Sequence, residues 1–219
     1  MPSKALGKFE GAMMKDVNRI IQTHADIQNG NPGNMGLGHL TRSGVLLLCA
    51  AWELYIEELL IESVTANIAR SSTPHDLPPP VQKTISQHVK TSKHELKPLA
   101  MAGDGWKTIY LEIAREVVVS LNTPKKHHID QYYLSLVGVP DLSSAWTLGA
   151  AAVNNFVEAR GDIAHRGSDA GNVHMNRLRD VFKPQITKCA IETDNAIATF
   201  IRNAFEPRSY PWNRKAVPN

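Results

Sequence analysis

The stretch FVEARGDIAHRG, residues 156–167, decides how the rest of the chain is interpreted. It follows an alanine-rich segment, residues 150–153, that favours a helix, and it ends at Gly167, which suits the position just beyond a helix C-terminus. Inside this expected helix, Arg160 provides a cation that can hold a phosphate group, and His165 provides a group that can transfer a proton. The sequence therefore predicts a helix with two side chains suited to phosphate chemistry.

The composition of the whole chain is that of an ordinary folded protein. Of its 219 residues, 42% are hydrophobic and 21% are charged. We expect a single domain over residues 1–219, with its core at about 9–205. The formal net charge is only +3, which neither requires nor excludes a nucleic-acid partner, so any basic surface must be local.

Cysteine content and hydropathy indicate the cellular compartment that we expect for the protein. Cys49 and Cys189 each lie in an apolar helical pattern, without the spacing of a disulfide framework or a metal site. We therefore expect reduced thiols, no metal and no cofactor. The N-terminus lacks the apolar run of a signal peptide, and the run at residues 45–52 is shorter than the roughly 20 residues that cross a bilayer. These features favour a soluble, cytoplasmic protein that does not contact a membrane.

Apolar residues recur at helical spacing along most of the chain, and no segment shows a hairpin signal. The sequence predicts an all-α fold with helices over about 9–28, 41–70, 81–89, 104–119, 122–136, 143–166 and 172–205. Thr41 or Ser43 is expected to cap one of these helices, and Ser143 or Ser144 another. Pro184 should kink or split the last helix.

Two segments read as irregular structure. Residues 29–38 contain four glycines and a proline but lack the lysine and Ser/Thr of a phosphate-binding loop, so we interpret them as a mobile connector. The tail, residues 206–219, has prolines and little apolar pattern, so we expect it to be loosely ordered.

Glu53 is an acidic residue at the edge of the apolar stripe in the helix predicted at 41–70. It lies four residues after Cys49 and three before Ile56. A carboxylate in this place is either paired with a basic group or extended toward solvent, and the sequence leaves both alternatives open. Because an unpaired charge there would be costly, we predict that Glu53 is partly buried and within salt-bridge reach of Arg160.

An arginine followed five positions later by a histidine is a weak pattern by itself. Allowing three spacings, the chain's arginines and histidines would give about 1.4 such matches by chance. The sequence contains three, at Arg19–His24, Arg70–His75 and Arg160–His165. The first histidine lies on an apolar stripe, and the second lies in a proline-rich connector. The third histidine lies near a predicted helix C-terminus, where the helix dipole favours its protonated form and the nearby Arg160 and Arg166 oppose it. Such a balance suits general acid–base chemistry.

Helix geometry limits how the third pair can act. Five residues of an ideal helix correspond to about 140° of rotation and about 7.5 Å of rise. Arg160 and His165 therefore converge only if the helix loosens, which Gly161 permits, or if the arginine reaches along it. The alternative is a surface ion pair between Asp162 and Arg166, four residues apart, followed by a capping glycine.

Beyond the pair itself, the chain resembles a known family. The Arg-x4-His spacing resembles the signature of HEPN domains. The segments LLLCAAWELYIEELLIE, residues 46–62, and IDQYYLSLVGVPDLSSAW, residues 129–146, resemble the second long helix and the connector of RiboL-PSP-type members. The likeness covers about residues 9–205. It implies a helical bundle with two long antiparallel helices and additional shorter ones. Gly161 departs from the family, which commonly has a polar residue directly after the arginine.

The resemblance implies a metal-independent RNA endonuclease. His165 would take the proton of the 2′-hydroxyl or protonate the leaving 5′-oxygen, which gives a 2′,3′-cyclic phosphate. Arg160 would hold the scissile phosphate, with Glu53 orienting it and with Asp162 and Arg166 in supporting positions. Family members commonly form homodimers in which two motifs face one cleft, so a homodimer is expected here.

The resemblance also implies biological partners. Bacterial members act as toxins or in phage defence, so an antitoxin or a defence-system protein is a plausible partner besides RNA. Two alternatives stay open: a non-catalytic HEPN module that binds RNA, nucleotide or protein, and a purely structural helical adaptor.

Overall fold

The computed structural model describes residues 1–30, 36–121, 124–169 and 173–218. Over these residues the regular structure is entirely helical, which confirms the predicted all-α fold. The main elements are α1 (Lys4–Lys8), the π-helical turn η1 (Phe9–Met13), α2 (Met14–Gly30), α3 (Gly38–Arg70), α4 (Pro79–Thr91), α5 (Gly105–Ser120), α6 (Lys126–Leu136), α7 (Ala150–Arg166), the π-helical turn η6 (Arg177–Phe182) and α8 (Lys183–Ala204). Short 3₁₀ turns lie at η2 (Pro74–Asp76), η3 (Lys97–Met101), η4 (Leu142–Ala145) and η5 (Gly167–Asp169).

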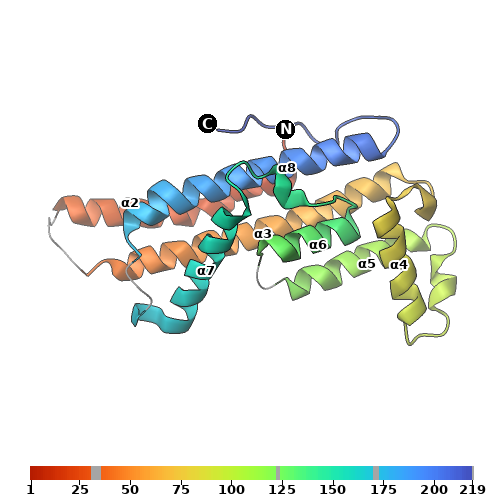
Figure 1. Cartoon of the computed structure of the whole chain (residues 1–219), viewed down its shortest axis with the longest axis horizontal. Coiled ribbons are helices and arrows are strands. Elements are labelled where there is room, and N and C mark those ends of the chain that lie inside the picture. The colour runs from red at the N-terminus through yellow and green to blue at the C-terminus, as the bar shows by residue number, and fades with distance from the viewer. Residues whose placement is uncertain (31–35, 122–123, 170–172, 219) are drawn as a thin grey trace.

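Two long helices pack antiparallel along the molecule. The continuous helix made by α1, η1 and α2 runs in one direction, and α3 returns beside it (Figure 1). α8 lies along this pair, α7 crosses α3, and α4, α5 and α6 gather toward the C-terminal half of α3 (Figure 1). This is the predicted arrangement of long antiparallel helices with shorter ones added. The centre of the predicted connector, residues 31–35, and the predicted helix start at residues 122–123 lie outside the described residues.

α3 is the central helix because it buries large side chains against several neighbours. Trp52 and Tyr55 are fully buried, and the Tyr55 hydroxyl donates to the carbonyl oxygen of Ala190 in α8 at 2.7 Å. The Tyr133 hydroxyl of α6 donates to the carbonyl oxygen of Ile56 at 2.8 Å. Each buried aromatic of this size contributes about 2–3 kcal/mol to stability, provided that its polar atom is paired. No helix within the described residues, α3 included, is long and apolar enough to cross a membrane.

The start of α3 differs from the prediction. The helix begins at Gly38, directly after Leu37, so neither Thr41 nor Ser43 is its cap. Thr41 is buried within the helix, and Leu37 is 8% exposed. Burial of Leu37 against the core fixes the chain where the helix begins, and packing outweighs the usual preference for a polar cap.

The last long helix changes its helical type near Pro184, where the sequence predicted a kink or a split. Pro184 lies in the first turn of α8, and η6 directly precedes it. Proline lacks an N–H group and crowds the carbonyl four residues earlier, and the wider π-helical turn accommodates both effects. η6 packs closely on α3, since a Cβ atom added to Gly44 would lie 2.4 Å from Cδ2 of Leu178.

The tail, expected to be loosely ordered, lies along α8 with specific contacts over its described residues. The Asn195 side chain pairs with both backbone groups of Lys215, donating to the carbonyl oxygen and accepting from the N–H, at 2.8 Å each. The indole N–H of Trp212 donates to the carbonyl oxygen of Asp194 at 3.3 Å, and Trp212 is 8% exposed. One tryptophan and one amide thus hold a segment whose sequence has no apolar periodicity.

Candidate functional site

Helix α7, which carries the candidate residues, starts later than predicted. It begins at Ala150 after Gly149, whose φ of 74° lies in the left-handed region, while Ser143 and Ser144 lie in the preceding turn η4. Ser143 is not a helix cap, because its N–H and its hydroxyl both donate to the carboxylate of Asp130 in α6, at 2.7 and 2.8 Å. Because Ser143 is hydrogen-bonded to Asp130 on another helix, it does not cap α7.

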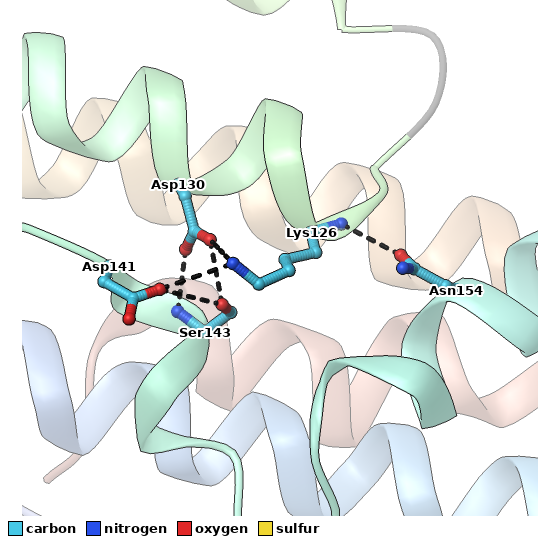
Figure 2. A network of polar contacts seen from close by, with 5 residues as sticks. All are labelled: Lys126, Asp130, Asp141, Ser143 and Asn154. Carbon is cyan, nitrogen blue, oxygen red and sulfur yellow. Dashed lines mark hydrogen bonds and ion pairs between the residues drawn. The ribbon is translucent and has the colours of Figure 1, made fainter.

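A polar network fixes the connector between α6 and α7 (Figure 2). The Lys126 ammonium donates to Asp130 at 2.8 Å and to Asp141 at 3.4 Å. The backbone N–H of Lys126 donates to Oδ1 of Asn154, near the start of α7, at 3.2 Å. Asp141 has a φ of 46°, which is uncommon for a residue other than glycine, and it also accepts from Ser143 at 3.3 Å. The network joins α6, the connector and α7, and it sets where α7 crosses α3.

α7 is anchored again along its length and at its end. The ammonium of Lys125 lies 3.1 Å from the carboxylate of Glu158, two residues before Arg160. The helix ends at Gly167, with a φ of 55°, and the N–H of that glycine donates to the carbonyl oxygen of Ile163. The predicted glycine at the helix C-terminus is confirmed.

Arg160 lies on the face of α7 that packs toward α3. It follows Phe156 and Val157, which are both buried, by about one helical turn, and its own side chain is half-buried. Its positive charge acts on two residues of α3, Cys49 and Glu53. Within the described part of the chain, Arg160 makes no hydrogen bond and no ion pair shorter than 4.0 Å. The Arg160 guanidinium is therefore a half-buried cation that forms no ion pair with any described carboxylate.

Burial and Arg160 act in opposite directions on the two neighbouring groups of α3. Burial raises the pKa of the Glu53 carboxyl above its ordinary value, and Arg160 offsets part of that rise. Burial also raises the pKa of the Cys49 thiol to about 11, with Arg160 lowering it and Glu53 raising it. Cys49 therefore stays protonated at neutral pH and is a poor nucleophile. Glu53 is half-buried beside Arg160, as predicted, but the two groups are not in salt-bridge contact within 4.0 Å.

His165 lies in the last turn of α7 and is exposed. The loosening that Gly161 would permit does not occur, because α7 is a regular helix through this position. On such a helix, residues five apart point in directions about 140° apart. Arg160 and His165 of one chain therefore point differently, the first toward α3 and the second toward solvent.

Asp162 and Arg166, the other two candidates on α7, are both exposed. The ion pair considered for them on the basis of their spacing is not formed, since the ion pairs found among described residues do not join them within 4.0 Å. The end of α7 thus presents Asp162, His165 and Arg166 to solvent without mutual pairing.

A neighbouring arginine was missed by the sequence reasoning. The ring of Phe156 on α7 lies 5.3 Å from the ring of Phe182 on η6, and the guanidinium of Arg177 lies 4.9 Å from the Phe182 ring centre. Arg177 and Phe182 are five residues apart, a spacing that brings side chains together in a π-helical turn but not in an α-helix. The signal for such a turn was Pro184. It predicted that the helix is interrupted, but not that the interruption is a π-helical turn.

A surface groove lies away from the candidate residues, and no metal-binding cluster is found among the described residues. This groove, of about 740 Å³, lies between α1, α3 and the tail and includes Leu54, Ile61 and Trp212, but neither Arg160 nor His165. Over the described residues, no three His, Cys, Asp or Glu side chains are arranged to hold a metal ion. The candidate residues lie on α3 and α7, and η6 packs beside them.

Comparison with known proteins adds the family. The model of the RiboL-PSP-HEPN family matches residues 13–199, a span that contains Glu53, Arg160 and His165. No curated protein and no solved structure matches the chain. The match covers far more than half of the sequence and agrees with the helical bundle described above. The chain belongs to the RiboL-PSP-HEPN family.

Proposed function

We propose that this chain is a metal-independent RNA endonuclease of the HEPN type. The observation that carries the proposal is the state of Arg160, which is half-buried and electrostatically coupled to Glu53 but makes no ion pair of its own. A guanidinium held in this way can donate hydrogen bonds to the oxygens of a phosphate group at once, because no carboxylate has to be displaced. The family match over residues 13–199 supports the assignment.

Each candidate residue then has a role in cleavage. Arg160 holds the scissile phosphate and stabilises the negative charge that develops on it. His165 removes the proton of the 2′-hydroxyl, whose oxygen attacks phosphorus, or gives a proton to the 5′-oxygen that leaves. The products are a 2′,3′-cyclic phosphate and a free 5′-hydroxyl. Glu53 orients Arg160 from α3, and Asp162 and Arg166 support the site from α7.

The proposed active form is a homodimer with two motifs facing one cleft. Within one chain, Arg160 and His165 point in different directions on a regular helix. Cleavage also needs one group to take a proton and another to supply one, whereas the motif supplies a single histidine. A second copy related by two-fold symmetry provides the second histidine without any further residue type.

The biological setting follows from the resemblance. We place this activity in the cytoplasm, as a toxin or a phage-defence component. A free ribonuclease would harm the cell that makes it, so a neutralising antitoxin or a defence-system protein is the partner that we expect besides RNA.

The direct test is cleavage of RNA in the presence of EDTA. We expect the purified protein to cut RNA with the chelator present and His165→Ala to lower the rate by about 10²–10⁴-fold, the usual contribution of an acid–base group. Because His165 is exposed, the variant should keep its thermal stability. His94→Ala removes an exposed histidine outside α7 and should cut normally. Cutting that survives His165→Ala, or that requires a divalent metal, would contradict the proposal.

A non-catalytic HEPN module that binds RNA, nucleotide or protein is the second candidate. The regular course of α7 favours it, because Arg160 and His165 of a single chain do not converge on one phosphate. This candidate predicts that RNA binds, that it stays intact over long incubation, and that Arg160→Ala weakens binding while His165→Ala does not.

A further inference from the structure

We propose that Arg177 is a substrate-positioning residue that binds a phosphate of the RNA strand beside the one held by Arg160. The proposal rests on the proposed RNA substrate but assigns no chemical step to Arg177. It concerns a residue outside the Arg160–His165 motif, on the short π-helical turn η6.

The position of Arg177 next to the motif helix follows from two aromatic contacts. Phe156 precedes Arg160 by four residues, so the two side chains lie on one face of α7. The Phe156 ring lies 5.3 Å from the Phe182 ring, and the Arg177 guanidinium lies 4.9 Å from the centre of that same ring. The tilted Phe156–Phe182 ring pair thus links the helix that carries Arg160 to the turn that carries Arg177. We place both arginines along the path of one RNA strand on this basis.

The element that carries Arg177 is firmly seated. Leu178, its neighbour, is fully buried, and it packs so closely on α3 that a Cβ atom on Gly44 would collide with it at 2.4 Å. Phe182 is 2% exposed. The guanidinium lies against the ring through cation–π attraction, which keeps its plane oriented and leaves N–H groups at its edge for an acceptor. A pre-oriented donor loses little entropy when it binds a phosphate.

The charge of Arg177 is not neutralised, in contrast to that of its neighbour. Arg177 is exposed and takes part in no ion pair within 4.0 Å among the described residues. Two positions later, Arg179 donates through Nε and Nη2 to both carboxylate oxygens of Asp180, at 2.7 and 2.8 Å. Both arginines are exposed and lie on η6, but only one offers an unpaired cation to solvent.

The other arginines of the chain also divide into those whose side chains are paired with an acceptor and those whose side chains are not. In the described ranges, the side chains of five arginines have neither an ion pair nor a hydrogen bond: Arg42, Arg115, Arg160, Arg166 and Arg177. Arg160 and Arg166 lie on α7, Arg177 lies one aromatic contact away, and Arg42 lies on α3 two residues from the Gly44 contact with η6. Three of the five unpaired guanidinium groups thus lie on α7 or on the adjoining η6, whereas Arg42 lies on α3 and Arg115 on α5. The unpaired positive charge on α7 and η6 is local, because the net charge of the chain is only +3.

The experiment measures RNA binding in the His165→Ala background, so that the RNA stays intact, over a range of salt concentrations. We expect Arg177→Ala to weaken binding of a single-stranded RNA about tenfold and to reduce the slope of log Kd against log salt by about 0.7, the loss of one phosphate contact. Arg179→Ala is the matched control, because Asp180 already neutralises that charge. It should leave both the affinity and the slope unchanged.

A second readout uses the otherwise unaltered protein. Arg177→Ala should raise KM about tenfold and leave kcat within about twofold, since the residue binds but does not react. Arg177→Lys keeps the charge without the planar donor edge, so its affinity should lie between those of the wild type and the alanine variant. It also serves if the alanine variant folds poorly.

The outcomes separate this proposal from the nuclease proposal. If Arg177→Ala binds RNA as tightly as its parent, or if Arg179→Ala weakens binding equally, Arg177 is not a phosphate contact, whatever the cleavage assay shows. If the protein does not cut RNA but Arg177→Ala alone weakens binding and lowers the salt slope, the contact stands and the nuclease proposal falls. If the parent protein does not bind RNA, both proposals fall.

Discussion

Glu53 is the residue at which stability and function are opposed. Its carboxyl is half-buried, and burial raises its pKa more than the nearby Arg160 charge lowers it. The ionised form is therefore less favourable in the folded protein than in the unfolded chain, and the arginine does not compensate for lost hydration. The proposed role of this carboxylate is to orient Arg160 through its charge, since its burial does not stabilise the fold.

Glu53→Gln should accordingly separate the two properties. We expect cleavage to fall about 10²-fold, because a misplaced Arg160 no longer grips the phosphate in the reactive geometry. We expect the melting temperature at pH 7 to stay equal or to rise. Because the pKa of Glu53 is raised in the folded protein, its carboxyl lowers folding stability only at a pH high enough to ionise it. The stability gained by the variant should therefore be absent near pH 4 and present at pH 7.

Glu57→Gln is the matched control for this variant. Glu57 lies one turn farther along α3, and its pKa is also raised, first by burial and then by Glu53 and Glu58. The substitution should change stability in a similar way and leave cleavage intact. A large loss of stability in Glu53→Gln would show instead that Glu53 and Arg160 form a stabilising pair.

At the scale of elements, α7 behaves as a rigid rod. It is regular through Gly161, and a Cβ atom added there would meet nothing within 4 Å. Its ends are held by the Lys126 network and by Gly167 (Figure 2). The glycine therefore lowers helix stability without serving a close approach or a special backbone angle.

Gly161→Ala should stabilise the protein by about 0.5–1 kcal/mol, because alanine has the higher helix propensity. The melting temperature should rise by about 2 °C, measured by circular dichroism. If the regular helix is the active form, RNA cleavage is retained. A variant that is more stable but does not cut RNA would show instead that α7 must open at Gly161 during the reaction.

The limits of sequence reasoning are also clearest at this scale. Apolar periodicity predicted the helices and placed Glu53 at the edge of a buried stripe, because both depend on local spacing. The expectation that Glu53 lies near Arg160, which is on another helix, came from the cost of an unpaired charge and from the family resemblance. Sequence reasoning misplaced the start of α7, since the partner of Ser143 is Asp130 on another helix. It missed the contact of Arg177 with Phe182. Residues five apart point in different directions on an α-helix but lie on one side of a π-helical turn.

At the scale of the whole molecule, the two chain ends meet on α8 around a buried acid. Ser3 donates its hydroxyl to the side chain of Asp194, and Trp212 donates to the carbonyl oxygen of the same residue. The N–H of Asn213 donates to the carbonyl oxygen of Met1 at 2.9 Å. Asp194 is fully buried, and burial, with a smaller effect from Glu62, raises its pKa to about 6. This closure of the ends was not visible in the sequence.

Asp194 should make stability depend on pH. Its pKa is raised, so below pH ~3 it is protonated in both states and costs nothing. As pH rises to about 6, the unfolded chain loses its proton first and stability falls, by about 3 kcal/mol in total, and the loss then stays constant. Asp194→Asn cannot ionise, so the melting temperature of wild type relative to this variant should drop by about 5–10 °C between pH 4 and pH 7. Calorimetric scans that stay parallel over this range would refute the prediction.

The proposed homodimer predicts a distinctive behaviour of mixed dimers. If two His165 side chains serve one cleft, as proton acceptor and proton donor, a dimer of one wild-type chain and one His165→Ala chain has lost one of the two roles. Two differently tagged chains, co-expressed and purified through both tags, give this mixed dimer. We expect its rate to be far below half of the wild-type rate, close to that of the double variant. Half the wild-type rate would mean that each chain cuts independently, and a monomer by light scattering at micromolar concentration, with cutting intact, would exclude the shared cleft.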